Sequence, residues 1–175
     1  MDKLDIVTDE SGNEVVLLPE IIFSNKQNIN WNDVEDYLGK YVGELIEIAE
    51  TRDIIYIGNK FPDEYGGSSY TRKTKGARAK AKANAAQGIR EMVEIATDKV
   101  YRENHKETHS EDAHNGWFYY VTRFAIPFYN NEKKTGEYNV YSACLVVNHA
   151  ANGKMYLYDV VGIKKEASNP LKTIK

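Results

Sequence analysis

The sequence has little of what several protein classes require. Its 175 residues include one cysteine, Cys144, which can form neither an internal disulfide nor a cysteine-rich zinc site. No apolar run reaches the roughly 18 residues that a membrane-spanning helix needs. The first residues, MDKLDIVTDESGNE, are acidic and lack the apolar stretch of a signal peptide. We predict one soluble, cytoplasmic domain over residues 1–175, in which residues 1–20 could be an N-terminal extension, with no membrane contact.

Two common chemical motifs are also missing. The glycine pair at 66–67 lacks the surrounding pattern of a phosphate-binding P-loop. His105 and His109 have the spacing of residues on one helix face, but position 106 is lysine, so the HExxH order of zinc peptidases is absent. We therefore predict no metal and no cofactor. These two histidines, with His114, are read as a solvated connection that could still supply an acid or a base.

Positive charge is scarce in the first part of the chain and concentrated in one later segment. Residues 1–50 hold twelve acidic residues against three lysines, whereas residues 71–90 hold seven Lys or Arg and no acid, in a chain of net charge −3. Salt screens charges beyond about 10 Å, so a local cluster attracts an anion more effectively than the net charge suggests. The segment is either an RNA-binding surface or a solvated lysine-rich helix face.

Three helices are predicted in the first part of the chain. The segment NINWNDVEDYLGKYVGELIEIAE repeats apolar residues at three- and four-residue spacing, which predicts a helix over 31–50. The Ala- and Lys-rich composition of 73–87 and the apolar spacing of 89–103 predict two more. A short strand at 53–58 and a Gly-, Pro- and Ser-rich loop at 59–70 are expected between them.

Three long segments rich in Tyr and Val follow, at 117–129, 138–150 and 154–163. Asn152-Gly153 between the last two is the strongest short signal for a β-hairpin. Helices followed by an antiparallel meander predict an α+β fold, with the N-terminal helices packed on one face of the sheet.

A two-residue turn at Asn152-Gly153 would place His149 opposite Tyr156. One face of the hairpin would then carry His149, Tyr156, Tyr158 and Lys164. The other face is predicted to lie under the helices, and it comprises Val140, Cys144, Val146, Asn148, Met155, Leu157, Asp159, Val161 and Ile163. Arg123 would project from the preceding strand towards the polar face, or would form a structural ion pair with an acid such as Asp159.

Three stretches carry a family resemblance: FSNKQNINWNDVEDYLGKYVGELIEIAE, YIGNKFPDEYGGSSYTRKTKGARAKAKANAAQGI and VNHAANGKMYLYDVVGIKKEASNPL. They resemble domains of prophage and mobile-element proteins of Gram-positive bacteria, often found at the C-terminal end of phage head-morphogenesis proteins. That group is placed by fold with the barnase–EndoU–colicin–RelE class of metal-independent ribonucleases. The similarity covers most of the chain after about residue 20.

The resemblance implies a ribonuclease-like toxin or effector that cleaves RNA, tRNA among the candidates, by attack of the 2′-hydroxyl group. Such cleavage needs a base, an acid and cations. His149 is predicted as acid or base, because imidazole titrates near neutral pH, and Arg123 as the phosphate ligand. The remaining predicted catalytic residues are Tyr156, Tyr158 and Lys80. The predicted RNA-binding residues are Lys75, Arg78, Lys82 and Lys164.

A second class of function stays open at this point. The chain could instead be a non-catalytic phage protein that binds and inhibits a host defence protein, with its acidic first 50 residues imitating nucleic acid. A ribonuclease toxin would have a cognate immunity protein as partner, whereas an inhibitor would have its host target.

Overall fold

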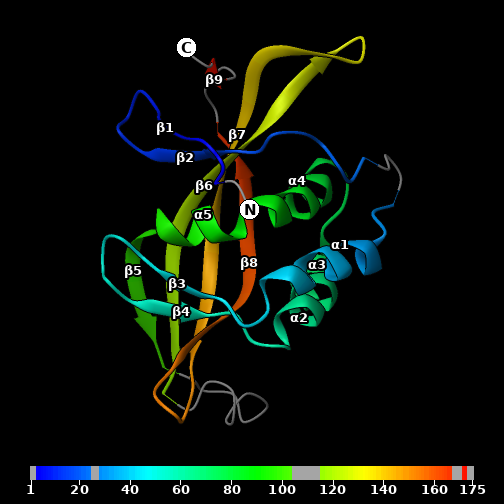
Figure 1. Cartoon of the computed structure of the whole chain (residues 1–175). Coiled ribbons are helices and arrows are strands. Elements are labelled where there is room, and N and C mark those ends of the chain that lie inside the picture. Colours follow the sequence, from blue (N-terminus) through cyan, green and yellow to red (C-terminus); the bar gives the residue numbers. More distant parts are fainter. Residues whose placement is uncertain (1–2, 25–27, 104–114, 167–170, 173–175) are drawn as a thin grey trace.

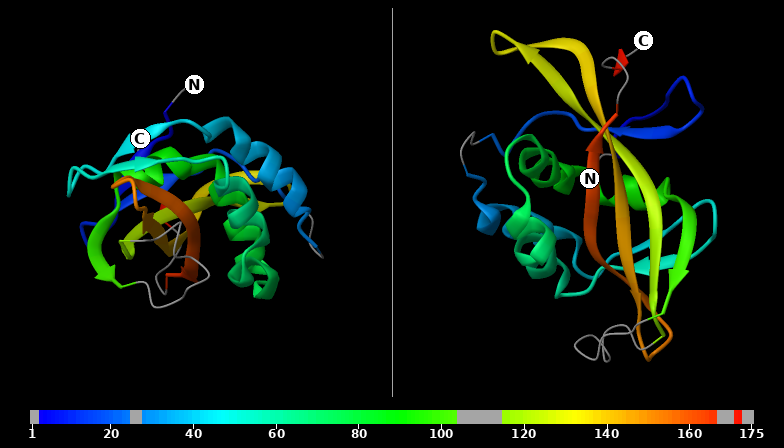
Figure 2. Two further views of the ribbon diagram at one scale, coloured as in Figure 1. Left: turned by 90° about the horizontal axis from the view of Figure 1, so that it is seen from below. Right: turned by 180° about the vertical axis from the view of Figure 1, so that it is seen from behind.

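The computed structural model describes residues 3–24, 28–103, 115–166 and 171–172, and shows a mixed α+β fold (Figure 1). Its described strands form one nine-stranded sheet in the order β1-β2-β6-β7-β8-β4-β3, with β5 paired to β6 and β9 to β7. The helices lie on one side of this curled sheet, and the long strands lie in front of them when the molecule is seen from behind (Figure 2). None of the described helices is both long and apolar enough to cross a bilayer.

The helices are short. They are α1 (Trp31–Leu38), η1 (Gly39–Tyr41), α2 (Phe61–Gly67), α3 (Ser69–Lys73), α4 (Ala77–Ala85), η2 (Ala86–Gly88) and α5 (Ile89–Glu94). The strands are β1 (Ile6–Thr8), β2 (Glu14–Leu17), β3 (Leu45–Glu47), β4 (Ile54–Tyr56), β5 (Thr97–Arg102), β6 (Trp117–Asn130), β7 (Lys133–His149), β8 (Met155–Lys165) and β9 (Leu171–Lys172).

Two predicted helices were too long. The helix predicted over 31–50 ends at Tyr41, and Gly43 then adopts a φ of 94°, a left-handed conformation that glycine tolerates. Residues 45–47 form β3, paired antiparallel with β4. The helix predicted over 89–103 stops at Glu94, and β5 follows and pairs with β6. Tertiary pairing overrides local helix propensity in both segments.

The loop predicted at 59–70 is wrong, because α2 and α3 occupy most of it. Pro62 lies in the first turn of α2, where its missing N–H costs nothing, and Asp63 favours the positive end of the helix. The hydroxyl group of Ser68 accepts a hydrogen bond from the Thr71 amide at 3.2 Å and so caps α3. The helix predicted over 73–87 begins only at Ala77, after Gly76 with a φ of 64°.

The meander prediction is confirmed. Strands β6, β7 and β8 pair antiparallel in sequence order. The rest of the sheet is mixed, because β2 pairs parallel with β6 and β4 pairs parallel with β8.

The predicted hairpin register is wrong by one residue at the turn. The loop has three residues, 151–153, closed by a 3.0 Å hydrogen bond from the Ala150 amide to the Lys154 carbonyl, so His149 lies opposite Met155. The predicted helix-covered face of β7 is also wrong. The residues of β7 that enter the main core are Tyr141, Ala143, Leu145 and Val147, whereas Val140 belongs to a small cluster with Val15, Leu17 and Ala125.

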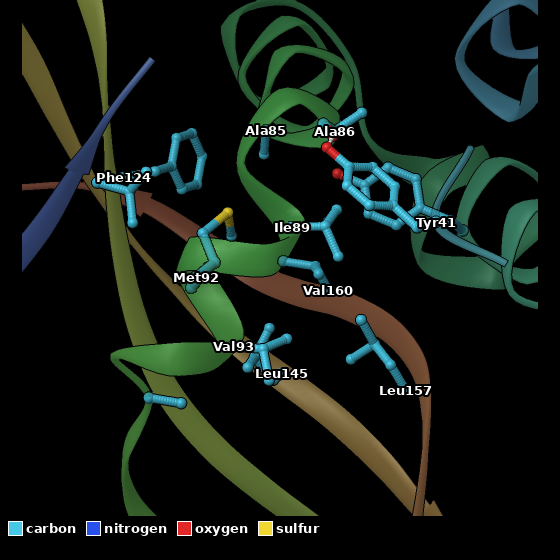
Figure 3. Close-up of a cluster of buried hydrophobic side chains, with 14 of the residues drawn as sticks. Tyr41, Ala85, Ala86, Ile89, Met92, Val93, Phe124, Leu145, Leu157 and Val160 are labelled. Atoms are coloured by element: carbon cyan, nitrogen blue, oxygen red, sulfur yellow. Dashed lines mark hydrogen bonds between the residues drawn. The ribbon is translucent and has the colours of Figure 1, made fainter. Parts of the chain in front are cut away.

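The main core lies between the helices and the concave face of the sheet. Figure 3 shows Ile89, Met92 and Val93 of α5 directed at strand residues that include Phe124, Leu145 and Val160. Four alanines in and beside α4 are fully buried: Ala81, Ala83, Ala85 and Ala86. Their small side chains allow the helix backbone to approach the sheet closely.

One ion pair lies inside this core. Lys82 of α4 and Asp159 of β8 have side chains 0% and 2% exposed, and the Lys82 Nζ lies 2.6 Å from the Asp159 carboxylate. Lys82 Nζ also donates to the Thr71 hydroxyl group at 2.6 Å, and it lies 4.6 Å from the Tyr65 ring centroid. Burial lowers the pKa of Lys82 and raises the pKa of Asp159, while their mutual attraction opposes both shifts.

We predict that Asp159→Leu alone lowers the free energy of unfolding by about 3–5 kcal/mol, because it leaves the Lys82 charge buried without its partner. The double variant Lys82→Met/Asp159→Leu should recover most of that loss, since it removes both charges and keeps the volume. Urea unfolding of the two variants and the parent measures both values. A loss below about 1 kcal/mol in Asp159→Leu, the range of exposed pairs, would contradict the prediction.

Candidate functional site

The structure separates the residues predicted to form the active site. His149 projects to the core face of the sheet, where its ring lies 5.6 Å from the Phe118 ring. Its neighbour Asn148 projects to the other face, as does Tyr156 opposite it. His149 and Tyr156 therefore do not share a face of the hairpin.

Arg123 does not lie beside His149 either. It pairs with Ser142, seven positions along β7 from His149, and its Nε donates to the Glu166 carboxylate at 3.0 Å. Arg123 thus makes a structural ion pair, as the alternative interpretation expected, but with Glu166 rather than Asp159. Its guanidinium group is already engaged by a carboxylate.

The basic segment divides into a buried and an exposed part. Lys82 was predicted to line an RNA-binding cleft with Lys75 and Arg78, and this is wrong because Lys82 lies in the core. Lys75 and Arg78 are exposed, and Lys80 is partly buried on α4. Lys164 is exposed on β8, away from α4 in sequence and opposite Ser142.

A cationic hollow of about 670 Å³ opens at the turn between α3 and α4. Its lining includes Lys73, Lys75, Arg78 and Tyr70. Within the residues that the structure describes, these three cations make no ion pair with an acid. The hollow is therefore a local positive surface on a chain whose net charge is negative.

A smaller pocket of about 240 Å³ lies where β4 leads into α2 beside the β7–β8 hairpin. The structure brings two predicted site residues, Tyr156 and Tyr158, into its wall. The residues that supply the chemistry of the pocket are Lys60, Phe61, Glu64, Asn148, Tyr156 and Tyr158. Aromatic rings, a cation, a carboxylate and an amide thus converge on one small space.

Neighbouring rings hold the two tyrosines in place. The Tyr156 ring lies 5.7 Å from the Tyr56 ring, and its hydroxyl group accepts a hydrogen bond from the Asn152 side chain at 3.2 Å. The Tyr158 ring packs edge to face against Trp117, with 5.1 Å between the ring centroids. Such packing fixes the orientation of both phenol rings at the pocket.

Asn148 is the unusual member of this pocket. Its exposed fraction is 7%, and its Oδ1 has no hydrogen-bond donor among the described residues. A buried acceptor without a partner costs about 1–3 kcal/mol, so such atoms are rare in folded proteins. The wall of the pocket therefore includes a residue whose buried acceptor is satisfied by no described group.

A second polar cluster lies on the core face near His149. Lys99 lies 2.9 Å from the Asp53 carboxylate, which also accepts a hydrogen bond from the Tyr120 hydroxyl group at 2.7 Å. The Lys99 ammonium group lies 4.4 Å from the centroid of the same Phe118 ring that His149 contacts. Burial raises the pKa of Asp53, but hydrogen bonds from Lys99, Tyr120 and Thr51 outweigh burial and leave this pKa below its ordinary value.

Sequence reasoning missed Asn148, Lys60, Glu64 and Asp53 as site residues. Lys60 and Glu64 were hidden because their segment was predicted to be a plain loop. Asn148 carried a signal, since an amide within the apolar run CLVVNHA has to find partners if it is buried. No group of three or more metal-ligating residues occurs in the described part of the chain, and His105, His109 and His114 lie outside it.

The lowered pKa of Asp53 predicts a pH effect on stability. The unfolded carboxyl group titrates near its ordinary value of 3.8, and the folded one at lower pH, so its contribution is present above 3.8 and is lost as the pH falls through the folded value. Asp53→Asn should unfold more easily than the parent at pH 7, and the difference should shrink below about pH 4.

Thermal unfolding from pH 2.5 to 7 measures this difference. Asp98→Asn is the matched control, because Asp98 is exposed and has a left-handed φ of 57° that asparagine accepts. A difference between Asp53→Asn and parent that stays constant down to the lowest pH would contradict the prediction.

Comparisons with protein-family models, with curated proteins and with solved structures find no match to this chain.

Proposed function

We propose that this protein binds single-stranded RNA and acts as a metal-independent, ribonuclease-like effector of a phage or mobile element. The observation that carries the proposal is the pocket in which Tyr156 and Tyr158 stand beside Lys60, Glu64 and Asn148. Proteins recognise single-stranded RNA by stacking unpaired bases on aromatic rings and by hydrogen bonds to the base edges. The pocket offers both kinds of contact.

The cationic hollow supplies the second element of such binding. Lys73, Lys75 and Arg78 line it, and lysine and arginine bind the phosphates of a nucleic acid backbone regardless of sequence. An acidic chain with one cationic surface can hold RNA there, because screening restricts repulsion from the acidic regions to short range.

The layout of the fold supports assignment to the barnase–EndoU–colicin–RelE class. In this chain, helices precede the antiparallel meander β6-β7-β8 and pack on its concave face. The class shares that plan and varies its catalytic residues. One fold can host many activities, so the residues of the pocket, and not the plan, indicate the chemistry.

Cleavage at the pocket would need a base, an acid and a cation. The Glu64 carboxylate is the candidate base for the 2′-hydroxyl proton, and the phenol of Tyr156 or Tyr158 is the candidate acid for the leaving 5′-oxygen. Lys60 would stabilise the charge that develops on the phosphate. All four residues line the pocket.

The backbone contact is tested by Lys75→Glu. We predict weaker binding of a labelled single-stranded RNA and a log–log salt slope shallower by about 0.7, the value for one phosphate contact on a single strand. The matched control is Lys133→Glu, an exposed lysine at the start of β7, which should leave the slope unchanged. Fluorescence anisotropy between 50 and 300 mM salt measures both. An unchanged slope in Lys75→Glu would show that the hollow is only a solvated surface.

The chemistry is tested by cleavage of labelled RNA in the presence of EDTA. We predict that Glu64→Gln lowers the cleavage rate by roughly 10²- to 10⁴-fold, the usual contribution of general acid–base catalysis, while RNA affinity changes little. Asp63→Asn is the matched control, because Asp63 is an exposed carboxylate one residue earlier on α2 and does not line the pocket. If Glu64→Gln cleaves at the parent rate and His149→Ala does not, the chemistry belongs to the sheet face beside Phe118.

A second function is favoured by one observation. Leu45 and Ile54, on the paired strands β3 and β4, are 58% and 40% exposed, and β3 is an edge strand of the sheet. An exposed apolar edge can accept a strand of a protein partner. If the parent neither binds nor cleaves RNA, binding to a host protein through this edge becomes the better proposal.

A further inference from the structure

The unpartnered acceptor in the pocket indicates which ligand the site takes. Asn148 is a lining residue of the pocket, and its buried Oδ1 lacks a donor among the described residues. A ligand that completes the pocket must therefore present an N–H or O–H group to this atom. A ligand that offers only acceptors would leave Oδ1 without a donor, and the lone pairs of the two acceptors would repel each other.

The walls of the pocket restrict the ligand further. A volume of about 240 Å³ lies below the roughly 300–1,000 Å³ of pockets for drug-sized ligands, and it suits a single flat ring system. Tyr156 and Tyr158 line the pocket, and a base that stacks on an aromatic ring gains about 1–3 kcal/mol. A nucleobase with an amino group on its edge meets both demands.

We propose that the pocket binds adenine, with the Asn148 amide reading its edge. This inference rests on the proposed RNA-binding function. Asparagine and adenine are complementary: the amide oxygen accepts from the exocyclic 6-amino group, and the amide nitrogen donates to the adjacent ring nitrogen. Adenine also has a larger stacking face than a pyrimidine.

The test uses labelled pentamers of sequence UUXUU, where X is adenine, purine (adenine without its amino group), guanine or uracil. For the parent, X = adenine should bind roughly 5- to 150-fold more tightly than X = uracil or purine, which is the discrimination expected of one bidentate amide contact. Asn148→Leu should bind the adenine and purine pentamers equally. Asn139→Leu, on the same strand but outside the pocket, should keep the parent's preference.

A second variant tests the direction of the hydrogen bonds. Asn148→Asp keeps an acceptor and removes the donor, and guanine presents two adjacent N–H donors on its pairing edge. The preference should therefore shift from adenine to guanine. Both variants should fold, because Asp and Leu have the same branching and number of side-chain heavy atoms as Asn. Asn148→Leu should unfold at a higher temperature than the parent, since it removes an unsatisfied buried acceptor.

The possible outcomes distinguish a failure of adenine recognition from a failure of the proposed RNA-binding function. If all four pentamers bind the parent equally well, RNA binding stands and adenine recognition is overturned. If no pentamer binds, RNA binding fails. Adenosine 5′-monophosphate is the companion probe. If it binds with the same dependence on Asn148 while the pentamers do not bind, the ligand is a free nucleotide. Adenine recognition then stands and the RNA proposal fails.

Discussion

The contact between Lys82 and Asp159 organises the half of the molecule that carries both surface hollows. It joins α4 to β8, and through Thr71 it reaches α3. Isolated charges are expensive inside a protein, so α3, α4 and β8 are held in the one arrangement that keeps this pair together. The cationic hollow is built on α3 and α4, and the tyrosine pocket on β8. Both therefore depend on the same buried contact.

The same contact explains how an alanine-rich basic segment folds into the core. The alanines of α4 pack against the sheet, while Lys82 is satisfied from within by Asp159 and Thr71. Lys73, Lys75 and Arg78 stay exposed on either side of Gly76, where α4 begins. The basic segment 71–90 therefore contributes buried side chains to the core and presents positive charge near its beginning.

Sequence patterns predicted the meander well and the helical region poorly. Strands β6 to β8 are long and continuous, so composition and the Asn152-Gly153 turn located them. The helices are short, and their ends are set by Gly43, Gly76 and the pairing of β3 and β5, which depend on tertiary structure.

The site could be predicted only in part, because side-chain direction was ambiguous. Both alternating sets of β7 are apolar, and a three-residue turn moved the register by one position, so periodicity could not decide which set faces the helices. Tyr156 and Tyr158 were predicted from the sequence as site residues, and both line the pocket. Asn148 was noticed but was assigned to the face that the helices cover. Lys82 was assigned to the surface, because no residue of its own segment indicated that a buried acid would pair with it.

The parallel pairing of β4 with β8 brings together residues far apart in the chain. Glu64 and Asn148 are separated by 84 residues in the sequence, and both reach the pocket only once β8 has docked beside β4. Closing so long a loop is slow compared with forming the helices. During synthesis the pocket therefore cannot exist until β8 has left the ribosome, so any activity it carries is withheld from the growing chain until that point.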